Sequence, residues 1–366
     1  RGLREPVGDP IGGWIGKDPG KEPWNRNAAF VKLARNSRSL CVDLKHKKGR
    51  EIFLELVGHA DVVIENFSAS TMSNLNLDYE TLVEANPNII YLTMPGFGKT
   101  GPYKDWVAFG PIIEPMSGLT AAMGYSLEEP RNSGVALVDP TSATSAAAAI
   151  VTAIRSRKKK VGGSTQIEMS LHEAGVSFNG PWLIDSQLGA PSPVLNNGHP
   201  NMCPHGVYPC KGEDEWLALA CEDQNDWETL AKIDDSLDPS WTIKERQECA
   251  DSINLSIAVW CETRTKESAA EELQNMGIAA GPVNTVPDMF KDPHVEERKF
   301  FVPFERAETP MPGNPIKMEG IDSSDWTRCP DLGEHNFELL EDWLGYTPDE
   351  LNQFLEEGVI ADRPPS

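Results

Sequence analysis

Apolar and polar positions alternate in a regular way between residues 39 and 98. Short apolar runs at Ser39–Leu44, Asp61–Ile64 and Ile89–Met94 predict strands, because such runs bounded by turn residues are typical of buried strands. Apolar side chains at helical spacing predict helices over Lys48–His59 and Leu75–Ala85. A strand–helix–strand order with short turns is typical of a parallel sheet that is covered by helices. We therefore predict an α/β fold with a doubly wound parallel sheet.

The second half of the chain continues this pattern and then changes character. An alanine-rich segment over residues 142–156 predicts a helix, and Gln166–Ser170 predicts a further strand. Residues 179–210 are rich in Pro, Gly and Asn, which is typical of a linker. The strand predicted at Glu215–Ala220 opens a second, smaller α+β domain. In that domain Thr265–Met276 predicts a helix with Thr265 as N-cap and Gly277 just past its end.

These changes in composition predict two domains that are joined by two long linkers. The predicted parts are a large domain over residues 1–180, a linker over 181–210, a small domain over 211–301, a return linker over 302–330 and a C-terminal helical segment over 331–366 that packs on the large domain.

Charge and cysteine usage narrow the possible partners. The formal net charge of the 366 residues is −23, and such a field repels nucleic acid and anionic membranes. No apolar stretch is long enough to span a bilayer. The seven cysteines include no C-x-x-C pair, which predicts free thiols and a cytoplasmic location. The chain starts at Arg1 without an initiator Met or the apolar core of a signal peptide, and we expect it to be part of something longer.

Asp139 is the candidate for chemistry. It follows the apolar run Val135–Val138 and precedes the alanine-rich segment, so it lies at the carboxyl end of a predicted strand, where ligands bind in open α/β sheets. The alternative is structural, with Asp139 as N-cap and Pro140 at the first helical position. The loops Glu65–Phe67 and Pro95–Gly98 follow two other predicted strands, and we expect them at the same edge as Asp139.

Other constellations carry less weight. His199, Cys203, His205 and Cys210 lie within twelve positions, but their spacing fits no common zinc site, so no metal is predicted. Cys203 and His205 in a loop fix no geometry for a nucleophile and its base. The sequence contains neither a P-loop nor a G-x-G-x-x-G motif after a strand.

Together, the motifs resemble the class III CoA-transferases, a family that includes formyl-CoA transferase, carnitine CoA-transferase and the α-methylacyl-CoA racemases. The resemblance runs nearly end to end, and the order and spacing of its motifs make it specific. The matching stretches are Ser39–Lys45, Asp61–Phe67, Gly96–Pro102, Ser117-Gly118, Gly124, Ser133–Asp139, Gly206–Tyr208, Gly281–Asn284, Asp292-Pro293 and Leu332–Asn336.

The resemblance implies a fold and a set of site residues. It implies a Rossmann-like large domain, a small domain and two linkers, with two chains interlocked as a homodimer. It places Asp139 as the catalytic aspartate and coenzyme A or acyl-CoA as a substrate, with no permanently bound cofactor and a small carboxylic acid as the second substrate. The residues implied to contact CoA are Val42, Leu44, Lys45, Asn66, Phe67, Gly96, Phe97 and Gly98.

The chain departs from the family pattern at several places. The family's opening strand and its glycine- or alanine-containing turn are absent. Gly12 and Asn74 stand where arginines commonly meet the CoA phosphates. Asn196–His199 replaces the glycine-rich flap of formyl-CoA transferase, which argues against oxalate as a substrate.

We predict an acyl-CoA:carboxylate CoA-transferase that works through an aspartyl-CoA thioester, with three alternatives. The first is a racemase, which needs a second acid/base and is disfavoured because Phe109 stands where racemases carry a histidine. The second is a CoA-transferase/lyase of the dimethylsulfoniopropionate type, as half of a tandem protein. The third is an inactive CoA-binding subunit, against which the presence of Asp139 argues.

Overall fold

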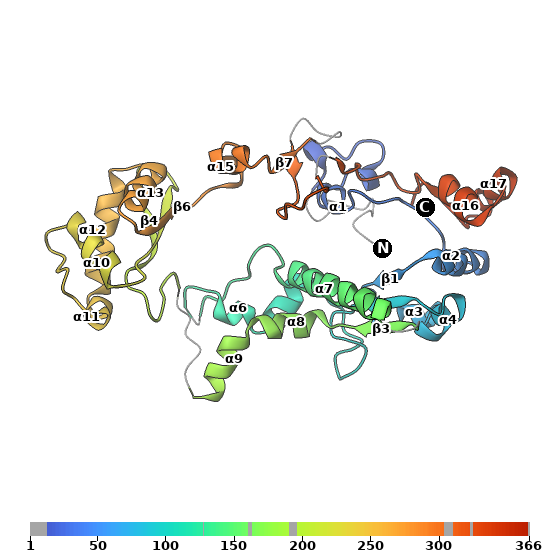
Figure 1. Cartoon of the computed structure of the whole chain (residues 1–366), viewed down its shortest axis with the longest axis horizontal. Coiled ribbons are helices and arrows are strands. Elements are labelled where there is room, and N and C mark those ends of the chain that lie inside the picture. The colour runs from blue at the N-terminus through green and yellow to red at the C-terminus, as the bar shows by residue number, and fades with distance from the viewer. Residues whose placement is uncertain are drawn as a thin grey trace. The chain divides into compact units, whose positions relative to one another are not determined.

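The computed structural model describes residues 13–126, 128–159, 163–189, 196–303, 310–322 and 325–364. The chain divides into two compact units. The first unit comprises residues 1–107, 143–170 and 290–366, and the second comprises residues 108–142 and 171–289. Figure 1 labels the elements of both units. Gly12, which stands where the family commonly has a phosphate-binding arginine, lies outside the described residues. Residues 190–195 and 304–309 of the predicted linkers also lie outside them.

The first unit is built on a three-stranded parallel sheet in the order β1-β2-β3, with β1 at Val62–Glu65, β2 at Ile90–Thr93 and β3 at Thr165–Glu168. Every residue of β2 is buried, as expected for the central strand of a covered parallel sheet. Buried side chains from β2, from helix α2 (Lys47–His59) and from helix α4 (Tyr79–Ala85) share one apolar core. The predicted parallel sheet and the strands at 61–64, 89–94 and 166–170 are confirmed, with small shifts of their ends.

Local sequence signals explain where these helices begin. The Asp78 carboxylate accepts a hydrogen bond from the Thr81 backbone N–H at 3.1 Å, which caps α4. Ile52 and Val57 are buried on one face of α2, as its helical spacing predicts. The other elements of this unit are η1 Ile15–Lys17, η2 Pro23–Asn25, α1 Ala28–Leu33, α3 Thr71–Asn74, α15 Pro293–Glu297, β7 Phe301–Val302, β8 Met311–Pro312, α16 Asn336–Leu344 and α17 Pro348–Glu356.

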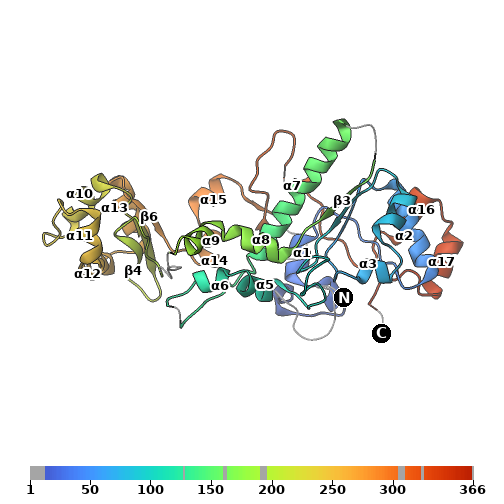
Figure 2. The same ribbon diagram turned by 90° about the horizontal axis from the view of Figure 1, so that it is seen from below.

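The C-terminal helices pack on α2. Leu340 of α16 and Leu351 of α17 are fully buried in a cluster with Ile52 of α2. Figures 1 and 2 both show α16 and α17 beside α2. This contact joins the end of the chain to its parallel-sheet unit.

The strand predicted at Ser39–Leu44 is wrong. Only Val42 forms an isolated antiparallel bridge, with Ile360, and the neighbouring backbone bond runs from the Asp43 N–H to the Val359 carbonyl at 2.9 Å. The apolar side chains of this run pack on the C-terminal segment instead of joining a sheet, so their burial does not require a strand.

The helices α5 (Gly110–Met116), α6 (Leu119–Ala122) and α8 (Leu171–Phe178) of the second unit pack together, as Figure 2 shows. The helix predicted at residues 142–156 is longer, because α7 spans Val138–Lys159 and begins in this unit. The predicted linker contains helix α9 at Gly180–Gln187 and ends in strand β4 at His205–Pro209.

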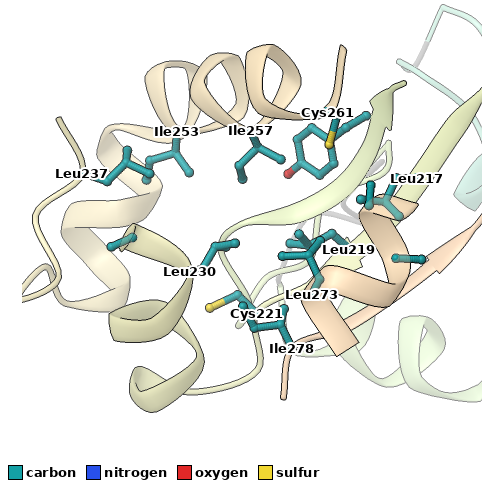
Figure 3. Packing of buried hydrophobic residues seen from close by; sticks show 14 of the residues in the cluster. Leu217, Leu219, Cys221, Leu230, Leu237, Ile253, Ile257, Cys261, Leu273 and Ile278 are labelled. Carbon is teal, nitrogen blue, oxygen red and sulfur yellow. The ribbon is translucent and has the colours of Figure 1, made fainter. Parts of the chain in front are cut away.

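A second sheet lies in this unit and is antiparallel, in the order β4-β5-β6. Strand β5 (Trp216–Ala220) confirms the strand predicted at 215–220, and β6 spans Ala279–Pro282. Figure 3 shows Leu217 and Leu219 of β5 in the core with side chains from two helices, α12 (Ala250–Glu262) and α13 (Lys266–Asn275). The remaining elements are α10 Gln224–Leu230, η3 Ala231–Ile233, α11 Ile243–Glu248 and α14 Val286–Met289.

The predicted boundaries of α13 are confirmed. The Thr265 hydroxyl accepts from the Ser268 backbone N–H at 3.2 Å and acts as N-cap. Gly277 follows the helix with a φ of +85°, the left-handed conformation that ends many helices.

Candidate functional site

Asp139 is the second residue of α7. The strand predicted at Val135–Val138 is wrong, because Gly134 and Ala136 both have positive φ, at +75° and +49°, which breaks any extended run. The predicted N-cap role is also wrong, since the helix begins one residue earlier, at Val138, and Pro140 is not its first residue. The Asp139 carboxylate therefore sits inside the first turn, where the helix dipole favours negative charge.

The carboxyl group of Asp139 packs directly on the backbone of Gly110. A Cβ atom at Gly110 would lie 2.6 Å from Oδ2 and 2.7 Å from Oδ1 of Asp139, which no real Cβ contact tolerates. Glycine at position 110 is therefore what allows the carboxylate to sit where it does. Among the described residues, no group donates a hydrogen bond to this carboxylate, so its oxygens are available for chemistry.

Glu114 of α5 fixes the loop that leads to Asp139. Glu114 is 1% exposed, and its carboxylate oxygens accept from the backbone N–H and the hydroxyl of Ser133, at 2.5 and 2.8 Å. It also accepts from the Leu137 N–H at 3.2 Å. One buried carboxylate thus holds the loop at both ends. Sequence reasoning missed Glu114, although an acidic residue in the apolar helix Gly110–Met116 was a visible signal.

Close packing between α5 and α8 supports this arrangement. A Cβ at Gly175 of α8 would lie 2.8 Å from the Ser117 hydroxyl and 3.2 Å from the Val138 side chain. The Ser117 hydroxyl donates to the Glu114 carbonyl, and the buried Asn179 amide donates to the Ser117 carbonyl at 2.7 Å. The start of α7 therefore rests on a well-packed base.

The environment raises the pKa of Asp139. Partial burial against the Gly110 backbone is the main cause, and the negative charge of Glu114 adds to it. The Asp139 side chain still presents exposed surface, so solvent moderates the effect. A carboxylate that is poorly stabilised and free of hydrogen-bond donors is a better nucleophile than an ordinary surface Asp.

Phe109 immediately precedes Gly110, and the residue is 64% exposed. The Phe109 ring therefore belongs to the residue next to Gly110, whose backbone contacts the Asp139 carboxylate. A phenyl ring carries no proton to exchange, so this position offers no acid or base.

The first unit holds the residues implied to contact CoA. Val42 and Leu44 line a cavity of about 720 Å³, whose walls are almost entirely apolar, with Arg38 as the one charged lining residue among those described. Lys45 is exposed beside this segment, and its backbone N–H donates to Asp43. Val42 and Leu44 thus share one cavity.

The other implied contacts follow neighbouring parallel strands. Asn66 and Phe67 are exposed just after β1, and Gly96, Phe97 and Gly98 follow β2. Gly98 has a φ of +82°, so the loop turns where glycine is favoured. The structure confirms that these two loops share a sheet edge. Asp139 belongs to the second unit, so its predicted place at that edge stays a prediction.

Two further observations concern metals and membranes. Within the part of the chain that the structure describes, no group of three or more His, Cys, Asp or Glu side chains is arranged to hold a metal ion. Likewise, no described helix combines the length and apolar character needed to cross a bilayer. All seven cysteines lie within the described residues, and none of them forms a disulfide.

Comparison with known proteins decides the family. The profile of CoA-transferase family III matches residues 4–336. The chain belongs to this family. It is a CoA-transferase, and CoA thioesters are the substrates of such enzymes.

Named relatives and a solved structure support this assignment. The chain is 29% identical to succinyl-CoA–D-citramalate CoA-transferase of Chloroflexus aurantiacus, over 96% of this chain and 89% of that protein. It is 32% identical to succinate–glutarate CoA-transferase of Agrobacterium fabrum, over 86% and 81%. The crystal structure of a CAIB/BAIF family protein from Brucella suis matches with a TM-score of 0.79 and 26% identity, over 93% of this chain and 88% of that one.

Proposed function

We propose that this CoA-transferase moves CoA between an acyl-CoA and a small carboxylic acid through a covalent aspartyl-CoA thioester on Asp139. The observation that carries the proposal is the Asp139 carboxylate, which is held against Gly110 with a raised pKa and without hydrogen-bond donors among the described residues. A nucleophile must be placed and left uncommitted, and this carboxylate meets both conditions.

The proposed reaction divides one acyl transfer into steps that a carboxylate can perform. An Asp139 oxygen attacks the thioester carbonyl, the C–S bond breaks, and CoA leaves as thiolate from a mixed anhydride. The thiolate then attacks Cγ of Asp139, which releases the donor acid and leaves the aspartyl-CoA thioester. An acceptor carboxylate attacks that thioester and reverses both steps, so that a new acyl-CoA departs and Asp139 is free again. Backbone N–H groups at Gly96–Gly98 or Asn196–Gly198 are candidates to stabilise the oxyanions.

Short dicarboxylic acids are the proposed substrate class. The relatives named above act on succinate or succinyl-CoA with citramalate or glutarate, and a relative from Haloarcula hispanica, 30% identical, is a succinyl-CoA:mesaconate CoA-transferase. All these acids carry two carboxylates on a short chain. We infer that this chain uses succinyl-CoA or a close analogue as donor.

We propose that CoA binds to the first unit, along the cavity at Val42 and Leu44 and the loops after β1 and β2. The apolar walls suit the adenine and pantetheine parts, and Lys45 supplies a nearby positive charge. Asn66 and Phe67 offer an exposed amide and an exposed ring at this sheet edge, Gly96 and Phe97 are partly exposed there, and Gly98 is buried in the turn.

An interlocked homodimer in the cytoplasm is the proposed state. Large apolar side chains are exposed on α5, α7 and α9, including Ile112, Val151 and Ile184, and a partner subunit would cover them. The domain boundaries predicted from composition remain part of this proposal.

Among the alternatives, racemisation is disfavoured by the phenyl ring at Phe109. A lyase step after transfer leads to elimination products, whereas a silent CoA-binding role leads to no product at all. The test is a screen of acyl-CoA donors against carboxylate acceptors, with products resolved by mass as CoA esters. Formation of glutaryl-CoA or mesaconyl-CoA from succinyl-CoA supports the proposal. No new CoA ester from any pair, with the protein folded, would point to the silent subunit, and elimination products would point to the lyase.

A further inference from the structure

The motif at residues 332–336 has no part in the proposed chemistry, yet it binds the backbone of the first unit at Ser39. The His335 backbone N–H donates to the Ser39 carbonyl at 3.0 Å, and the Ser39 N–H donates to Nδ1 of His335 at 3.1 Å. The Gly333 N–H donates to the Ser39 hydroxyl at 3.0 Å. The motif therefore holds the start of the segment 39–45, which carries three of the residues implied to contact CoA.

The Asn336 side chain joins three separate segments of the chain. Asn336 is 3% exposed; its Oδ1 accepts from the Cys41 N–H at 2.8 Å, and its Nδ2 donates to the Ala361 carbonyl at 2.9 Å. A Cβ at Gly333 would lie 2.8 Å from Nδ2 of Asn336, so glycine leaves room for the amide. A buried amide that spends both its acceptor and its donor on backbone groups fixes those groups in place.

The C-terminal end of the chain holds the same segment from another side. The Ala361 N–H donates to the Cys41 carbonyl at 3.2 Å, and the Asp43 N–H donates to the Val359 carbonyl at 2.9 Å. Both polar backbone groups of Cys41 are thus bound, one by Asn336 and one by Ala361, whose own carbonyl Asn336 also binds.

These bonds decide which side chains face the cavity of the first unit. Every second residue of this stretch lines the cavity of about 720 Å³, namely Arg38, Leu40, Val42 and Leu44. The bonds from the motif go to the residues between them, Ser39 and Cys41. A slip of one residue would turn the lining side chains away from the cavity, because side chains alternate along an extended segment.

We propose that Asn336 is a positioning residue for CoA binding, which fixes the register of the segment 39–45 and so places Val42, Leu44 and Lys45 against CoA. The inference rests on the proposed function, because the CoA contacts of these three residues belong to it. Asn336 is buried and acts through the Cys41 backbone. A segment that already has its bound register loses less conformational freedom when CoA binds, so the joint raises affinity.

Asn336→Ala and Asn336→Asp separate positioning from a merely structural role. Alanine leaves the Cys41 N–H and the Ala361 carbonyl without their side-chain partner. Aspartate has nearly the same shape and, ionised or protonated, keeps an oxygen that accepts from the Cys41 N–H. Ionised, it cannot donate to the Ala361 carbonyl. We expect both variants to have a lower melting temperature, and only Asn336→Ala to lose CoA affinity.

Isothermal titration of the folded full chain with free CoA measures that affinity. The apparent Kd rises as the competent fraction falls, so a segment in register about a tenth of the time raises the Kd about tenfold in Asn336→Ala. The Kd of Asn336→Asp should stay within about twofold of the wild-type value. In steady-state transfer, Asn336→Ala should raise the KM for succinyl-CoA and leave kcat within about twofold, as expected for lost binding.

Thr347→Ala is the matched control for lost stability. Thr347 caps α17 in the same C-terminal part of the chain, and its hydroxyl bonds to Glu350. Loss of the cap should lower the melting temperature and leave the Kd for CoA unchanged.

Direct binding keeps this inference separate from the proposed function. If the wild-type chain binds CoA but transfers none, the proposed function fails, and the Kd values of the variants still decide. A wild-type Kd in Asn336→Ala overturns the inference, as does an equal loss of affinity in Asn336→Asp or Thr347→Ala. A folded wild-type chain that binds no CoA also overturns it.

Discussion

Replacing Gly110 by alanine disturbs the contact that places the carboxylate of Asp139. The added Cβ would lie 2.6 Å from Oδ2 of Asp139, whereas ordinary van der Waals contact begins at 3.4 Å. Either the carboxylate or the start of α5 must therefore shift by about 0.8 Å to restore normal contact. A misplacement near 1 Å costs about 10²-fold in rate when a reacting group must be aligned. We expect Gly110→Ala to lower kcat by about 10²-fold.

The melting temperature of Gly110→Ala should stay the same or rise slightly, although kcat falls. Gly110 has no positive φ, and alanine is favoured over glycine inside helices by about 1 kcal/mol, so the melting temperature should hold unless the clash strains α5. Gly180→Ala is the matched control, because Gly180 is also the first residue of a helix, is also followed by Pro, and has no atom within 4 Å of an added Cβ. The assay is steady-state CoA transfer with a thermal melt of each variant. Full activity in Gly110→Ala, with an unchanged melt, would refute the link between this contact and catalysis.

Three further experiments test other parts of the account. Glu114→Gln should cost about 1–3 kcal/mol of stability through lost hydrogen bonds to Ser133 and Leu137. Because the Glu114 charge raises the pKa of Asp139, and transfer needs the ionised carboxylate, this variant should also move the acidic limb of the kcat/KM profile to lower pH; an unmoved limb contradicts the electrostatic argument. In heavy water, a 2-methylacyl-CoA should gain no deuterium at its α-carbon, since Phe109 supplies no second base; exchange at turnover-like rates would reinstate the racemase. Light scattering should give the mass of a dimer, and a fully active monomer would defeat the interlocked state.

Elements with purely local signals could be predicted from the sequence. The apolar runs at Asp61–Ile64 and Ile89–Met94 are strands, and Thr265 caps its helix, because the pattern of apolar residues and the capping residue can both be read from a few consecutive positions. Ser39–Leu44 has the same apolar character, but its backbone bonds go to the distant segment around Val359, which no local pattern reveals.

The candidate site also has a part that could be predicted from local sequence and a part that could not. Asp139 could be singled out as a carboxylate at a helix start. Its exact place depends on the left-handed conformations of Gly134 and Ala136, and alanine rarely adopts such a conformation, so the sequence gives no sign of it. Its contact with Gly110 and the anchoring of its loop by Glu114 join segments more than 18 residues apart. Such long-range contacts follow from tertiary packing and leave no periodic signal.

The mass of the Asp139 peptide tests the central claim most directly. The wild-type chain is incubated with succinyl-CoA alone, digested and analysed by mass spectrometry, alongside Asp139→Asn, which should fold because Asp139 is not the cap of α7. We predict a CoA-sized adduct on the wild-type peptide that contains Asp139, its removal by hydroxylamine, and no adduct in Asp139→Asn. Normal turnover by Asp139→Asn, or a CoA adduct on another residue, would contradict covalent catalysis by Asp139.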